Sequence, residues 1–212
     1  MFTKLLAYEI RSRYRADARS FGAFIAVIAI AAGIVAAGLP GISGSTAVLA
    51  YALCALTPAA CAIAALADYW KTLYGQRGYF TMSLPISGKV IFWAKNTRIA
   101  IECLLALALA VGGMLAVASA AAWSDGISLA EYTAGPRSLV AGVPTSTVSL
   151  MIAAQLILAM SWVVQACAAM TIGAEGRFNH MGFGAPIIGF VLVYVVNQVL
   201  STVGTFFLPL SV

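Results

Sequence analysis

The chain has few charged side chains. Asp, Glu, Lys and Arg make up 9% of its 212 residues, against about 25% in soluble globular proteins. Hydrophobic residues account for 62%, and the mean hydropathy is +0.98. The apolar runs are continuous, and they lack the alternating polarity typical of barrel strands. This composition predicts an all-α fold, that of a polytopic helical membrane protein.

Residues that form common catalytic and metal sites are also scarce. His180 is the only histidine, so no paired-histidine metal motif exists. The single Gly-Lys pair, Gly88-Lys89, is followed by Val90, and Ser83 stands where a P-loop has its first glycine. The four cysteines match no metal motif and predict no disulfide framework. We expect no enzymatic activity and no cofactor or metal bound directly.

Five apolar runs are each long enough to cross a hydrocarbon layer of about 30 Å as a helix. A basic segment, residues 1–20, precedes them. Its apolar residues fall on one helical face, which predicts an N-terminal interfacial helix; a solvated basic tail is the alternative. Because no long linker interrupts the chain, residues 1–212 are predicted to form a single transmembrane domain. The predicted spans are Phe21–Leu39, Ala47–Ala67, Ile99–Ala122, Val148–Gly173 and Phe183–Leu208.

Small residues recur at every fourth position on two of the predicted spans. Such ridges let helix backbones approach closely in lipid, so they predict helix–helix contacts. They are Ala29, Gly33 and Ala37 on the first span, and Ala108, Gly112, Ala116 and Ala120 on the third.

The basic residues are unevenly distributed over the predicted loops. Eleven of the twelve lie in the N-terminal segment, in the region from Tyr69 to Arg98, or in the link after the fourth span; only Arg137 lies on the other side. Cytoplasmic loops carry the excess of Lys and Arg in membrane proteins. The N-terminus is therefore predicted to be cytoplasmic. This placement at the ends of apolar runs reflects membrane topology, and we expect no nucleic-acid partner.

Five residues with a carboxylate or amide side chain lie within the predicted spans, where such groups are costly unless they are paired or functional. Glu102 lies near the start of the third span, and Arg98 one turn before it predicts a local ion pair. The four amides either line an intramembrane polar path with Glu102 or form hydrogen bonds between helices, which we favour. These amides are Gln155, Gln165, Asn197 and Gln198.

The longest polar interruption runs from Tyr69 to Lys95, YWKTLYGQRGYFTMSLPISGKVIFWAK. It mixes basic residues with many aromatic ones, a combination that suits the boundary between bilayer and water. An ordinary interfacial loop with aromatic anchors is one interpretation of this pattern.

Within this loop, Gly78 to Ser87 reads GYFTMSLPIS, and Lys95 follows before the third span. This motif resembles the cytoplasmic loop of type-2 ABC exporter permeases, in which a bacterial branch carries approximately Gly-Tyr-Leu-Thr-Phe-Thr-Leu-Pro-Val-Ser. The motif covers about ten residues, and its position between the second and third spans also matches the family. The family has six spans, whereas five are predicted here, so the chain is either incomplete at its C-terminus or a shortened member.

The resemblance implies a cytoplasmic coupling helix that docks on a separate soluble P-loop ATPase subunit, where ATP and Mg are bound. It also implies a permease subunit of an ATP-driven exporter in the bacterial cytoplasmic membrane, acting as a homodimer or as a heterodimer with a related permease. A non-transporting accessory or immunity protein that binds a partner in the bilayer is the alternative. The implied ATPase-docking residues are Arg77, Tyr79, Phe80, Met82, Leu84, Pro85 and Lys89.

Overall fold

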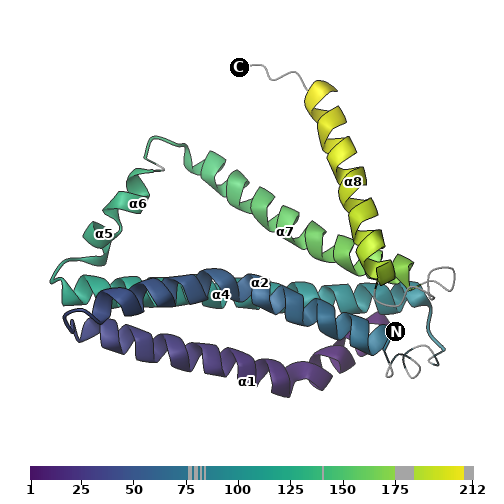
Figure 1. Ribbon diagram of the computed structural model, residues 1–212, viewed down its shortest axis with the longest axis horizontal. Coiled ribbons are helices and arrows are strands. Elements are labelled where there is room, and N and C mark those ends of the chain that lie inside the picture. The colour runs from purple at the N-terminus through teal and green to yellow at the C-terminus, as the bar shows by residue number, and fades with distance from the viewer. Residues whose placement is uncertain are drawn as a thin grey trace. The chain divides into compact units, whose positions relative to one another are not determined.

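The structure is a computed structural model that describes residues 1–75, 78, 81, 83, 85–139, 141–174 and 184–207 (Figure 1). The described residues form helices and no strand, which confirms the all-α prediction. The helices are α1 (Phe2–Ala36), α2 (Ser43–Leu73), α4 (Gly88–Ser124), α5 (Leu129–Tyr132), α6 (Ala134–Ser138), α7 (Thr145–Gly173) and α8 (Gly184–Phe207).

Four of these helices, α1, α2, α4 and α7, are long and apolar enough to cross a membrane. The fifth predicted span corresponds to α8, whose apolar section is Ile187–Val203. The chain therefore has the helices of a polytopic membrane protein. The number of crossings stays a prediction.

The helices differ from the predicted spans mainly at their ends. Residues 2–20 belong to the same continuous helix as the first span, so the N-terminal segment is not a separate short helix. Helix α2 continues to Leu73, and α4 already begins at Gly88, so the polar loop between them shortens to residues 74–87. Hydropathy marks where a helix leaves the apolar layer, whereas the backbone hydrogen bonds continue into the polar boundary.

The chain divides into two compact units. Unit 1 comprises Met1–Ala65 and Ile86–Leu156, and unit 2 comprises Leu66–Pro85 and Ile157–Val212. Unit 1 therefore holds α1, α4 and most of α2, and unit 2 holds α8 and the C-terminal half of α7. The prediction of a single transmembrane domain is not tested by this division.

In unit 1, three helices share a core. Ile28 of α1, Ala50 and Cys54 of α2, and Val117 of α4 are all buried in one cluster. Figure 1 shows α1, α2 and α4 lying alongside one another. The turn between α1 and α2 occurs at Pro40-Gly41, as predicted, and Gly41 has a φ of 81°, a conformation that favours glycine.

The helices contact each other through faces other than the predicted small-residue ridges. On α4 the buried stripe contains Ala106, Ala110, Gly113 and Val117, whereas Ala108, Gly112 and Ala116 lie outside it. The ridge on α1 (Ala29, Gly33, Ala37) is likewise exposed. The ridge prediction is therefore wrong for packing within the described chain. In an Ala-rich helix, several faces carry small residues, so their spacing alone does not select one.

Gly113→Val is expected to destabilise unit 1, whereas Gly112→Val is not. A Cβ at Gly113 would lie 2.8 Å from the Cys54 sulfur and 3.5 Å from side-chain atoms of Ile28 and Phe24, while a Cβ at Gly112 meets nothing within 4 Å. Both changes alter helix propensity equally, so their difference isolates the overpacking cost, about 1–3 kcal/mol. Thermal unfolding of the purified variants measures it. Equal melting temperatures would show that α1, α2 and α4 do not pack closely at this point.

Candidate functional site: a charged cluster and two cavities

A cluster of buried charges joins α1 to α4. Lys95, Arg98 and Glu102 of α4 are 2%, 1% and 7% exposed. The Lys95 ammonium lies 2.9 Å from one carboxylate oxygen of Glu9, and the Arg98 guanidinium lies 3.9 Å from the other. Arg98 also donates a hydrogen bond of 2.5 Å to Glu102. The predicted Arg98–Glu102 pair is thus confirmed, and Glu9 extends it to a second helix.

Glu9 was not recognised as a site residue from the sequence, although a signal for it exists. Leu5, Glu9, Arg13 and Asp17 follow one another at four-residue intervals and so share one face of α1. Leu5 is buried, and Glu9 meets its partners on α4 from that same face. Lys95 and Arg98, which were counted among the basic residues of a boundary loop, are instead buried between helices.

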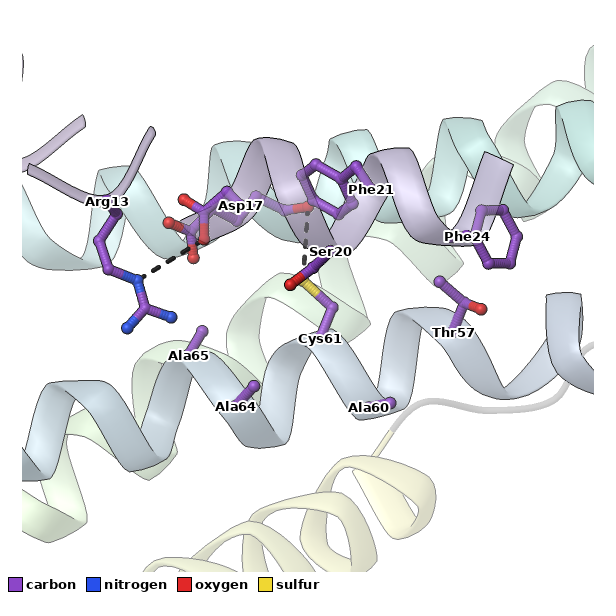
Figure 2. A pocket seen from close by; sticks show the side chains of 11 residues that line it. Arg13, Asp17, Ser20, Phe21, Phe24, Thr57, Ala60, Cys61, Ala64 and Ala65 are labelled. Carbon is purple, nitrogen blue, oxygen red and sulfur yellow. Dashed lines mark hydrogen bonds and ion pairs between the residues drawn. The ribbon is translucent and has the colours of Figure 1, made fainter. Parts of the chain in front are cut away.

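A cavity of about 300 Å³ lies between α1, α2 and α4, next to this cluster (Figure 2). Asp17 lies 3.6 Å from Arg13, one turn earlier on α1. Glu102 of α4 also lines the cavity. Cys61 of α2 donates a weak hydrogen bond to the Glu102 carbonyl oxygen at 3.8 Å, so α2 contacts α4 beside the cavity.

The other side of this cavity is apolar. Phe21 and Phe24 of α1 face Thr57, Ala60 and Ala64 of α2 across it (Figure 2). Ala60 and Ala64 are exposed at the surface of unit 1. The cavity is therefore an open groove between α1 and α2, and we call it the α1–α2 groove.

A second cavity, of about 380 Å³, lies within unit 2 between α7 and α8. Asn197 of α8 donates a hydrogen bond to the Gln165 side-chain oxygen of α7, and Gln198 lines the same cavity. The predicted amide hydrogen bond between helices is therefore confirmed for Gln165 and Asn197. Ser161, Tyr194 and Ser201 add further polar groups to the cavity.

The predicted polar path is only partly assembled in one place. Gln165, Asn197 and Gln198 meet in unit 2. Glu102 and Gln155 belong to unit 1, where Gln155 is exposed and Glu102 is held by Arg98. A continuous path through all five residues stays a prediction.

Most of the predicted docking residues (Arg77, Tyr79, Phe80, Met82 and Leu84) lie outside the described residues. Pro85 is exposed, and Lys89 is exposed in the first turn of α4. The predicted coupling helix therefore stays a prediction. Thr81 donates a hydrogen bond of 3.1 Å to the Thr72 carbonyl oxygen, which places Thr81 itself against the end of α2.

The end of α2 is tied to α7 within unit 2. Tyr69 is fully buried, and its hydroxyl lies 2.8 Å from the Thr171 hydroxyl. Because Thr171 itself donates to the Cys167 carbonyl, Tyr69 is the donor in this pair. Tyr74 packs edge-on against Tyr69, and burial raises the pKa of the Tyr74 phenol, so it stays neutral at physiological pH. Tyr69 and Tyr74 thus form a packed contact of two neutral side chains at the start of the loop.

Among the residues that the structure describes, no three metal-ligating side chains come together. Comparison of the chain with protein-family models, with curated proteins and with solved structures gave no match.

Proposed function

We propose that this chain is the membrane-spanning permease subunit of an ATP-driven ABC exporter. The observation that carries the proposal is the motif from Gly78 to Ser87, which lies in a short connection between two helices of membrane-spanning length, α2 and α4. A soluble ATPase subunit would bind ATP and Mg and would dock on this connection. The permease would work as a homodimer or as a heterodimer with a related chain.

The ends of α2 and α4 beside this connection are held by other helices, so they can transmit a movement from a docked ATPase. The chain enters it from α2, which is anchored to α7 through Tyr69 and Thr171. It leaves into α4, which is held to α1 by Glu9, Lys95 and Arg98. A movement imposed on residues 74–87 would therefore be passed to packed helix pairs as rigid-body motion rather than absorbed locally.

Purification in mild detergent from the native membrane tests the proposal. A P-loop ATPase should co-purify with the tagged chain, and its hydrolysis should respond to the presence of the permease. A chain that folds stably and keeps its biological effect in cells lacking every such ATPase would instead be an accessory membrane protein.

We expect the N-terminus to be cytoplasmic, because eleven of the twelve basic residues lie on its side of the predicted topology. Cysteines introduced at Ser12 and Ser128, both exposed, report on the two sides. A membrane-impermeant thiol reagent applied to intact cells should label Ser128→Cys and leave Ser12→Cys unmodified until the cells are opened. The unsubstituted chain is the background control, since its cysteines are buried or half-buried. If the reagent labelled Ser12→Cys and not Ser128→Cys in intact cells, the predicted orientation would be wrong and the N-terminus would lie outside.

A further inference from the structure

Helix α8 exposes an amide side chain in its apolar section. Gln198 lies within that section, Ile187–Val203, so a bilayer would surround it with hydrocarbon rather than water. Its side chain is exposed and forms no hydrogen bond with any residue that the structure describes. Its neighbour Asn197, by contrast, donates to Gln165 of α7. Leaving an amide unpaired in hydrocarbon is costly, so Gln198 needs a partner from outside the described chain.

Gln198 belongs to a row of side chains along one face of α8. Val191 lies about two turns earlier on this face, and Tyr194 and Ser201 lie about one turn to either side of Gln198. All four side chains are exposed. Tyr194, Gln198 and Ser201 also line the cavity between α7 and α8, together with Trp162, which is 38% exposed. The row therefore borders the open side of this cavity.

Two copies of α8 can approach each other without charge repulsion, because Gly184–Phe207 contains no charged residue. The exposed face of α1 differs in this respect. Basic residues follow one another on it at intervals of seven and four residues, and two copies meeting there would repel each other. These residues are Lys4, Arg11, Arg15 and Arg19.

The polar groups of the row are complementary to themselves. Two copies inserted in the same orientation place Gln198 of one at the same depth as Gln198 of the other, related by a two-fold axis. An amide both donates and accepts, so two such side chains can form reciprocal hydrogen bonds. The hydroxyls of Tyr194 and Ser201 also donate and accept. A helix of another protein would need a matching polar group at this depth, whereas a second copy supplies one by symmetry.

We propose that two copies of this chain associate through α8, with Gln198 of one copy hydrogen-bonded to Gln198 of the second copy. Val191 of each copy packs in the same contact two turns away, and the second α8 covers the open side of the cavity between α7 and α8. The inference gives a location to the homodimer of the transporter proposal. It rests only on α8 crossing the membrane and needs no ATPase.

Cysteine cross-linking tests the contact with a matched pair of variants. Val191→Cys and Val196→Cys each replace an exposed valine of α8, 52% and 57% exposed. Val191 shares the face of Gln198, whereas Val196 lies about 160° away around the helix. In membranes, oxidation with copper phenanthroline should cross-link Val191→Cys into a dimer and leave Val196→Cys monomeric. The unsubstituted chain is the background control, since its cysteines are buried or half-buried.

The contribution of the amide is measured by association. Copies carrying donor or acceptor fluorophores at Ser12→Cys are diluted in phosphatidylcholine vesicles, and energy transfer between them gives the dissociation constant. Gln198→Leu should raise this constant by about tenfold or more, the effect of two lost hydrogen bonds between helices. Gln198→Asn keeps an amide and should restore a large part of the association. Because Gln198 is exposed in the single chain, both variants should keep its fold.

Four results would overturn the inference. They are no cross-linked dimer of Val191→Cys, equal cross-linking of Val196→Cys, a cross-link from Val191→Cys to a different protein, and an unchanged dissociation constant in Gln198→Leu. The third would mean that a helix of another protein covers this face. None of these results depends on an ATPase, so the dimer contact and the transporter proposal can fail separately.

Discussion

Glu9→Gln is expected to lower the stability of the protein strongly, by about 3–5 kcal/mol. The Glu9 carboxylate is the partner of Lys95 on α4 and lies within 3.9 Å of Arg98. Both of these basic residues are almost completely buried. Removing the negative charge leaves them with less compensation in a site from which water is excluded, and α1 separates from α4 more easily. Thermal unfolding of the purified chain in detergent measures the loss.

Glu131→Gln is the matched control. It makes the same change on α5, where the side chain is exposed, so its effect should stay within about 0.5 kcal/mol. The double variant Glu9→Leu with Lys95→Met should recover part of the stability, because two apolar residues replace a buried pair and Arg98 keeps Glu102. Equal melting temperatures for Glu9→Gln and Glu131→Gln would show that the cluster does not hold α1 to α4.

Phe80→Ala combined with Leu84→Ala is expected to abolish co-purification of the ATPase while leaving the chain folded in the membrane. Both residues belong to the motif that resembles an ABC exporter loop, and apolar and aromatic side chains are the usual anchors of interfaces. Truncating one anchor costs about 1–4 kcal/mol, so two additive truncations cost about 2–8 kcal/mol and should weaken binding by about thirtyfold or more. The measurement is the amount of ATPase retained per permease, together with the rate of ATP hydrolysis.

Trp123→Ala controls for the loss of an exposed aromatic residue elsewhere, since Trp123 lies at the far end of α4 and is 80% exposed. It should leave ATPase retention unchanged. Arg77→Ala and Lys89→Ala should act more weakly than the double variant, and more at low salt, because charges at the edge of an interface mainly affect the encounter rate. Retention of the ATPase by the Phe80→Ala, Leu84→Ala variant would leave the loop as an interfacial anchor, and the transporter proposal would lose its main support.

The sequence alone was sufficient for the class of fold and for the positions of the long helices. Each of the five predicted spans overlaps one helix of the structure, because a continuous apolar run has no other way to satisfy its backbone in lipid. The turn at Pro40-Gly41 and the Arg98–Glu102 pair were also accessible, since both depend on neighbours a few residues apart. The positions of the helix ends were not accessible from the sequence, because polar residues continue a helix beyond the apolar layer.

Only the tertiary structure decided which residues from different helices meet. It selected the buried face of α4 at Gly113 rather than the ridge at Gly112, and it paired Gln165 with Asn197. It also turned Glu9, one acid in a basic segment, into the partner of Lys95 and Arg98. Local patterns record the apolar face and the period of each helix, but the rotation and register between two helices depend on the packing of both surfaces. For that reason the charged cluster and the α1–α2 groove become visible only once α1, α2 and α4 are placed together.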